Sequence, residues 1–410
     1  MNVLIIGYVW PEPNSSAAGS RMMQLINTMR EQAWPITFAS PAQQTEHMID
    51  LEPLGVRKQA IQLNCDSFDH FVAGLAPDLV IFDRFMMEEQ FGWRVEKHAP
   101  NALRVLNTED LHSLRDARHK AVKQDREFQI QDMYSDLGVR EIAAIHRSDL
   151  TLMISEYETA LLKQEFHVPE THLMHLPFML PPAKTEFKAF AARHDFIFIG
   201  NFRHAPNWDA VQQLKHTYWP AIRQRLPNAK LNIFGAYPPP KATQLHNEKQ
   251  GFLVKGWAEN ALDVIEDARI MLSPLRFGAG IKGKLVEAMQ VGTPSITSSI
   301  GAEAMHGVLP WNGIITDNTE EFVNAAVSLY QDQDSYTLMQ HNGREILRQR
   351  YDGEIWKARF IKRITLQMRL RDTLREHHFL GKLVRHHSMK STQYMSQWIT
   401  LKNERQDSPN

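Results

Sequence analysis

Two lysines lie in a glycine-rich stretch of the second half of the chain, where Phe277–Lys284 reads FGAGIKGK. We expect an apolar strand just before this stretch, at Arg269–Ser273, and a helix just after it, from about Leu285. Glycine lets a backbone approach a ligand closely, and the first turn of a helix offers free N–H groups and partial positive charge. With the ammonium groups of Lys282 and Lys284 added, the loop is suited to a phosphate or diphosphate.

The same loop holds further groups for such a ligand. We expect the backbone of Gly280 and Ile281 to approach the diphosphate together with the two lysines. Glu287 follows one helical turn later. A carboxylate repels phosphate but accepts hydrogen bonds from hydroxyl groups, so we assign Glu287 to a ribose. The alternative is a surface turn with solvated lysines.

Each half of the chain opens with the same pattern, which indicates how the loop is positioned. VLIIG at Val3–Gly7 and FIFIG at Phe196–Gly200 are apolar strands ending in glycine, each followed by a loop and a helical pattern, the first at Ser20–Arg30. Such runs, alternating with helical segments, indicate βαβ units in parallel sheets. Further strands are expected at Ile36–Ser40, Asp78–Asp83, Ala102–Asn107, Leu150–Ser155, Lys230–Gly235, Phe252–Val254, Arg269–Ser273, Pro294–Thr297 and Gly313–Thr316.

The pattern predicts an α/β fold with two Rossmann-like domains facing each other across a cleft. The expected divisions are a first domain at 1–176, a proline-rich linker at 177–194, a second domain at 195–355 and a helical extension at 356–410. Ligands of such sheets bind beyond the carboxyl ends of the strands, where the lysine loop lies. Neither of the two openings, which continue as GYVWPE and GNFRHA, contains G-x-G-x-x-G, and G-x-x-x-x-G-K-[ST] does not occur. This disfavours NAD enzymes and P-loop ATPases.

The stretch PLRFGAGIKGKLVEAMQVGTPSITSSIGAE resembles the donor-site signature of GT-B glycosyltransferases of the family-4 type. The segments GWAENALDVIEDARIMLSPLR, REIAAIHRSDLTLMISEYETALL and PEPNSSAAGSRM resemble other parts of these enzymes, so the resemblance extends over most of the chain. It implies the GT-B architecture and a retaining, metal-independent transfer of a sugar. The donor would be a nucleotide-sugar, UDP- or GDP-linked, used as a substrate without a further cofactor.

The resemblance also bears on individual donor-site residues. Ala279 stands where many members have the first of two glutamates, and that glutamate normally contacts the donor sugar. Asn207 stands where lysine is common. We therefore expect Arg203, together with the two loop lysines, to hold the diphosphate. A side chain at Gly19, on the opposite wall of the cleft, would crowd the phosphates.

The resemblance places the acceptor, which would be a glycan, a lipid-linked sugar or a protein, in the first domain. NTEDLHSLRDARHK, at 107–120, follows an expected strand and so faces the cleft. Asp110 and His112 are therefore the catalytic candidates, because histidine donates, accepts or shuttles a proton near neutral pH. In the alternative interpretation, Asp110 only caps the following helix and His112 is a surface residue.

The end of the chain is basic. Between Lys357 and Arg405 there are 12 lysines and arginines but only three acidic residues, although the whole chain has a net charge of −1. One apolar stripe, expected to cross back to the first domain, comprises Trp356, Phe360, Ile364 and Met368. A second comprises Tyr394, Met395, Trp398 and Ile399. Two environments are possible for this second stripe. It is either buried on the first domain, which is commoner for an aromatic stripe, or in peripheral contact with an anionic membrane.

Composition limits the remaining possibilities. No apolar run approaches the length of a membrane span, and no basic segment precedes Val3–Ile6 as in a signal peptide. Cys65 is the only cysteine, so we expect a cytoplasmic protein without an internal disulfide, possessing at most a peripheral site at the inner face of the membrane. We expect no metal, since the histidines of His377-His378 and of His386-His387 point to different helix faces, and no nucleic-acid partner.

Two rival functions stay open. A nucleotide-sugar epimerase on the same fold would need no acceptor, and its first domain would carry buried carboxylates that the sequence does not reveal. A non-catalytic nucleotide- or glycan-binding module is favoured by Ala279 and Asn207. The base, the sugar, the acceptor, the linkage and the oligomeric state are not specified by these patterns.

Overall fold

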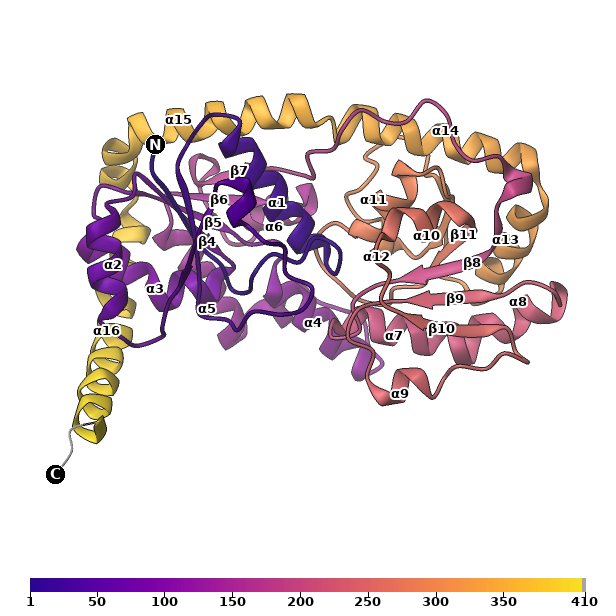
Figure 1. The fold of residues 1–410 in the computed structure, drawn as a ribbon, viewed down its shortest axis with the longest axis horizontal. Coiled ribbons are helices and arrows are strands. Elements are labelled where there is room, and N and C mark those ends of the chain that lie inside the picture. The colour runs from indigo at the N-terminus through magenta and orange to yellow at the C-terminus, as the bar shows by residue number, and fades with distance from the viewer. Residues whose placement is uncertain (408–410) are drawn as a thin grey trace.

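The structure, a computed structural model, describes residues 1–407, without the side chains at 387–389 and 403–407. It forms two α/β domains that lie side by side (Figure 1). The first sheet is fully parallel, in the order β3-β2-β1-β4-β5-β6-β7. Its strands are β1 (Val3–Ile6), β2 (Ile36–Ser40), β3 (Arg57–Ala60), β4 (Leu79–Asp83), β5 (Leu103–Asn107), β6 (Leu150–Met153) and β7 (Leu173–His175). Its helices are α1 (Ala17–Arg30), α2 (Ser67–Leu75), α3 (Phe85–His98), α4 (His112–Lys123), α5 (Asp136–Arg147) and α6 (Glu156–Gln164).

The second sheet is also fully parallel, in the order β10-β9-β8-β11-β12-β13. Its strands are β8 (His194–Ile199), β9 (Leu231–Phe234), β10 (Phe252–Gly256), β11 (Ala268–Ser273), β12 (Ser295–Thr297) and β13 (Gly313–Ile315). Its helices are α7 (Ala205–Gln213), α8 (Trp219–Arg225), α9 (Pro240–Thr243), α10 (Ala261–Asp267), α11 (Gly283–Gln290), α12 (Ser299–Ala302), α13 (Thr319–Gln331) and α14 (Gln333–Arg350). A π-helical segment, Leu214–Tyr218, joins α7 to α8. The predicted α/β class with two Rossmann-like domains is confirmed.

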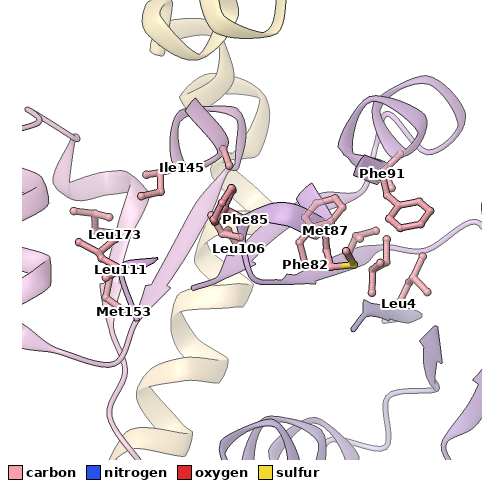
Figure 2. Close-up of a cluster of buried hydrophobic side chains, with 14 of the residues drawn as sticks. Leu4, Phe82, Phe85, Met87, Phe91, Leu106, Leu111, Ile145, Met153 and Leu173 are labelled. Atoms are coloured by element: carbon pink, nitrogen blue, oxygen red, sulfur yellow. The ribbon is translucent and has the colours of Figure 1, made fainter. Parts of the chain in front are cut away.

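The inner strands of each sheet are largely apolar because both of their faces are buried. Successive residues of a strand point to opposite faces, so Leu4 and Ile6 of β1 join one core while Val3 and Ile5 join the other. Figure 2 shows the first of these cores, in which Leu4 and residues of the neighbouring strands pack near α3. The second sheet repeats the arrangement with the alternating residues of β8.

The helix α15 (Gly353–His377) leads from the second domain back over the first (Figure 1). Phe360 and Ile364 are buried in the core that contains Val3, and Trp356 and Met368 are partly buried against it. The four-residue spacing of this stripe predicted that contact. The expected boundary at 356 falls inside the first turn of α15, because Asp352 caps the N–H groups of the two residues before Trp356. We propose the other two expected divisions, after residues 176 and 194, as domain limits.

Two local expectations were wrong. The first helix begins at Ala17 and not at Ser20, because the Ser16 side chain caps it by accepting a hydrogen bond from the Gly19 N–H at 3.0 Å. The strand β3 (Arg57–Ala60) was not expected, since it lies at the sheet edge and its polar residues carry no apolar signal.

Candidate functional site

A cleft of about 700 Å³ lies between the two domains and is lined by both. In each sheet, the strand order reverses direction at the central pair, β1 with β4 and β8 with β11. Such switch points open a crevice beyond the carboxyl ends of the strands. The loops that follow these strands line the cleft, among them 8–19, 200–207 and 278–284.

Lys284 lies in the first turn of α11 and faces the cleft. Its ammonium donates a hydrogen bond to Asn207 Oδ1 and lies 4.5 Å from the centre of the Phe198 ring. Burial lowers the pKa of Lys284 to about 7, although the nearby carboxylate of Glu287 raises it and Lys282 lowers it further. The side-chain amide of Asn207 therefore holds the Lys284 ammonium in the cleft.

Nucleoside-diphosphate binding is expected to weaken as the pH rises from about 7 to 9. In the empty cleft, Lys284 loses its proton near pH 7, whereas a bound diphosphate favours the charged ammonium. Binding above pH 7 must therefore take up a proton, and one such proton lowers the affinity by up to about tenfold per pH unit. Calorimetry at pH 8 in buffers of different ionisation enthalpy measures this uptake, and Lys284→Met should lower it. An affinity that is constant between pH 7 and 9 contradicts the assignment.

Lys282 is more deeply buried than Lys284 and turns back into its own loop. Its ammonium donates to the Gly280 carbonyl oxygen at 2.8 Å. Burial lowers the pKa of Lys282 to about 8, an effect opposed by the carboxylate of Glu303 and reinforced by Arg118. Lys282 thus contributes charge to the cleft from within a network of buried ions.

Arg118 belongs to that network and joins the two domains. It extends from α4 of the first domain and donates to both carboxylate oxygens of Glu303, at 2.7 and 2.8 Å. It also donates to the Gly278 carbonyl oxygen at 2.9 Å. A single buried guanidinium therefore fixes the start of the lysine loop against the first domain.

The backbone of Gly280 is less available to a ligand than the sequence predicted. Its φ is +65°, and a Cβ there would lie 2.9 Å from Cβ of Asp110, so the position requires glycine. Its N–H donates to the buried carboxyl of Glu158, from α6 of the first domain, at 2.5 Å. Burial raises the pKa of Glu158 to about 8, and the neighbouring Asp110 raises it further. The Gly280 N–H, which we expected to face the diphosphate, is thus paired with a protein carboxyl, while Ile281 is buried and lines the cleft.

Arg203 and Glu287 both line the cleft. The Arg203 guanidinium is exposed and lies 3.6 Å above the centre of the Tyr237 ring, a position open to an anionic ligand. Burial raises the pKa of Glu287, and the charge of Lys284 lowers it. The structure therefore places Arg203, Lys282, Lys284 and Glu287 around one cavity.

Gly19 also lines the cleft, but its immediate neighbour is its own loop. A Cβ at Gly19 would lie 2.3 Å from the backbone oxygen of Glu12. The Glu12 side chain accepts hydrogen bonds from Thr45 of the first domain and, at 2.9 Å, from the Tyr237 hydroxyl of the second. A side chain at Gly19 would therefore collide with the backbone of Glu12, and the expected crowding of the phosphates stays a prediction.

Gly19→Val is therefore expected to lower both stability and turnover. The valine must displace the backbone of Glu12, and overpacking of this kind costs about 1–3 kcal/mol. The displaced loop also loses its contact with Tyr237 across the cleft. Thermal unfolding and donor turnover measure the two effects. Gly74→Val is the matched control, because no atom lies within 4 Å of a Cβ at that position. An unchanged melting temperature in Gly19→Val would mean that the loop accommodates the valine without any loss of stability, contrary to this prediction.

Asp110 and His112 lie together at the cleft, and Asp110 does not cap α4. Asp110 pairs with Arg115, and its carboxylate lies 3.5 Å from His112 Nε2. Burial raises the pKa of Asp110, but Arg115 and His112 lower it more, so it ends well below its usual range. Burial lowers the pKa of His112 to about 4, so its ring is neutral at pH 7. The N–H groups of His112 and Ser113 donate instead to the carboxylate of Glu141, each at 2.9 Å.

Sequence reasoning missed a buried carboxylate pair, Asp83 and Glu109, on the first wall of the cleft. The amide of Asn107 donates to both, at 3.4 Å to Asp83 and 2.7 Å to Glu109. Burial raises the pKa of both groups, that of Glu109 to about 7. Glu109 and Arg84 have φ of +64° and +71°, a strained conformation that is common at functional sites. Asp83 is the last residue of one predicted strand, and Glu109 follows the end of another. This position at the carboxyl ends of strands is the signal that could have identified the carboxylate pair.

His378, one of the paired histidines of the tail, contacts other rings. Its ring centre lies 3.9 Å from that of His172 and 5.3 Å from that of His146. Burial lowers the pKa of all three. The cluster joins the end of α15 to the first domain, and His387 lies outside the described side chains.

Comparisons with known proteins agree with this geometry. Residues 193–332, which include the lysine loop and α11, match the model of the family Glycosyl transferases group 1. No curated protein matches the chain by sequence. Three solved structures illustrate its structural relatives.

Sucrose-phosphate synthase from Thermosynechococcus elongatus is similar with a TM-score of 0.63 and 14% identity, over 88% of this chain and 97% of that one. HepE from Anabaena, in complex with UDP and glucose, has a TM-score of 0.65 and 12% identity, over 89% and 99%. A TarM variant from S. aureus, in complex with fondaparinux, alpha-GlcNAc-glycerol and UDP, has a TM-score of 0.56 and 13% identity. That match covers 73% of this chain, which spans only 58% of the TarM chain. The fold is GT-B.

Proposed function

We propose that the protein is a glycosyltransferase that moves a sugar from a nucleotide-sugar to an acceptor, with retention at the anomeric carbon and without a metal. The observation that carries the proposal is the placement of Lys282, Lys284 and the start of α11 in a cleft between two Rossmann-like domains. The family match over this segment and the UDP held by two similar structures support it.

Catalysis would come mainly from stabilising the departing diphosphate. Among the described hydrogen bonds, no side chain caps the first turn of α11, so its N–H groups and dipole are open to an anion. Lys284 would add a full charge once the bound ligand restores the proton of its ammonium. Arg203, in the loop after β8, would add a second. Cations held in place in a buried cleft stabilise a leaving group without reorganising during the reaction.

The acceptor would lie on the first-domain wall. A glycan, lipid-linked or protein acceptor presents a hydroxyl group, and carboxylates are its natural partners. Glu109, whose raised pKa of about 7 suits proton transfer near neutral pH, joins Asp110 and His112 as a catalytic candidate. Neutral His112 would orient the hydroxyl, since its lowered pKa makes it a weak base.

The test begins with calorimetric binding of UDP, GDP and ADP to the full chain. The nucleotide that binds selects the nucleotide-sugars for a hydrolysis assay and then for transfer to candidate acceptors in polysaccharide, glycolipid and glycan biosynthesis. Transfer with the anomeric configuration retained supports the proposal. The absence of any nucleotide binding would contradict it, and binding without turnover would favour the non-catalytic module.

A nucleotide-sugar epimerase is the second candidate, because the structure supplies the buried carboxylates expected of it. Asp83 and Glu109 line the cavity from the first domain. An epimerase interconverts sugars in the absence of any acceptor, whereas a transferase shows only slow hydrolysis under those conditions. Analysis of the sugar recovered from the donor after incubation without acceptor separates the two.

A further inference from the structure

The last helix, α16 (Phe379–Asp407), docks on the first domain with one face only. The hydroxyl of Ser396 accepts a hydrogen bond from the buried Arg94 at 2.9 Å, and Thr400 donates to the Asn64 carbonyl oxygen at 2.9 Å. Nearer the start of the helix, Arg385 lies 3.6 Å from a carboxylate oxygen of Glu96. The docked face is therefore built largely from polar contacts.

The opposite face is apolar and exposed. Trp398 is 59% exposed, Tyr394 63% and Leu401 60%. At about 100° per residue, Tyr394 and Leu401 lie within about 60° of Trp398, whereas Ser396 lies about 160° away. Leu380 and Leu383 extend the same stripe toward the start of the helix and are also exposed. Burial of the second stripe on the first domain, the commoner of the two environments considered, is therefore wrong for these side chains.

From its start to Lys402, the charged residues of α16 are all basic. No aspartate or glutamate occurs between Glu376 and Glu404. Lys382, Lys390 and Lys402 are exposed. Lys402 lies 5.4 Å from the centre of the Trp398 ring, beside the apolar stripe. An apolar face that carries Trp and Tyr and is flanked only by cations matches the interface of an anionic lipid bilayer.

We propose that this face of α16 lies flat on an anionic membrane and anchors the first domain there. Within the described residues, no helix has the length and apolar character needed to cross a bilayer, so the contact is peripheral. Figure 1 shows α16 at the edge of the first domain, on the side away from the second. An anchor at this edge leaves the second domain free to move relative to the first. The inference does not depend on the proposed transferase activity.

The experiment measures co-sedimentation of the full chain with vesicles. One set contains phosphatidylcholine alone and the other phosphatidylcholine with phosphatidylglycerol. We expect binding to the anionic vesicles only, and a weaker interaction at high salt. The variant W398E/L401E should bind at least about tenfold more weakly, because the apolar contribution is replaced by repulsion. Its melting temperature should match that of the parent, since both side chains are exposed.

The matched control introduces the same charges on exposed apolar residues elsewhere. Val308→Glu with Leu338→Glu replaces side chains that are 101% and 60% exposed in the second domain. This control should bind vesicles like the parent. The proposal is overturned if the parent stays in the supernatant, if W398E/L401E binds as well as the parent, or if the control loses binding equally. Sedimentation velocity without lipid adds a further decisive outcome, since a dimer that W398E/L401E dissociates would show that a second copy covers the face.

Discussion

Lys284→Ala is expected to weaken nucleoside-diphosphate binding by about 1.5–3 kcal/mol, or roughly 10- to 150-fold, the scale of a charge-assisted hydrogen bond in a buried site. Lys284 lies in the first turn of α11 and faces the cleft, where its ammonium contacts the neutral amide of Asn207 and the Phe198 ring. A diphosphate would therefore be its first full counter-charge within contact distance. Calorimetric titration of the selected nucleotide measures the loss.

If Lys284 binds the phosphates, its substitution must weaken the binding of every ligand that carries a diphosphate. Lys284→Ala should weaken binding of inorganic diphosphate and of the nucleotide alike, whereas Glu287→Ala should weaken the nucleotide more than the diphosphate. Lys249→Ala removes an exposed lysine of the same domain outside the cleft and serves as the control. If Lys284→Ala binds both ligands like the parent, the loop is a surface turn and the site assignment fails.

Most of the fold could be predicted because the parallel strands are buried on both faces. β1 and residues 196–199 of β8 are unbroken apolar runs for that reason, and their lengths and flanking glycines distinguish them from helices. The strand β3 escaped prediction because only one edge of it pairs with the sheet, and its residues Arg57–Ala60 are partly or fully exposed. A polar edge strand carries no hydrophobic period.

The lysine loop could be recognised because its chemistry is contiguous in sequence, whereas the groups that hold it could not. Glu158 and Arg118 lie more than 100 residues away, on helices of the other domain. Nothing in their local sequence indicates which loop they meet. The alternative in which Asp110 caps α4 fails for the same reason. The carboxylate that accepts hydrogen bonds from the first turn of α4 belongs to Glu141, which is distant in sequence, and not to the adjacent Asp110.

Arg118→Met is expected to destabilise the protein by about 3 kcal/mol and to lower the kcat/KM for the donor. The substitution removes the guanidinium from the partly buried carboxylate of Glu303 and from the carbonyl oxygen of Gly278. Breaking a buried pair by removing one partner costs about 3–5 kcal/mol, because the other charge is left without its counter-ion. We place the loss at the lower end of that range because Lys282, whose pKa is raised by Glu303, supplies part of the missing charge.

The double variant Arg118→Met with Glu303→Met tests whether the effect belongs to the pair. Its loss of stability should be smaller than the sum of the two single losses, since neither charge is then stranded. Arg126→Met is the matched control, because Arg126 makes a similar two-bond contact with Asp132, at 2.7 and 2.8 Å, on the surface of the first domain. Exposed pairs of this kind contribute little, so its unfolding curve and kcat/KM should follow the parent. If Arg118→Met keeps the parent's donor kcat/KM while losing stability, the bridge holds the domains together without positioning the lysine loop for the donor.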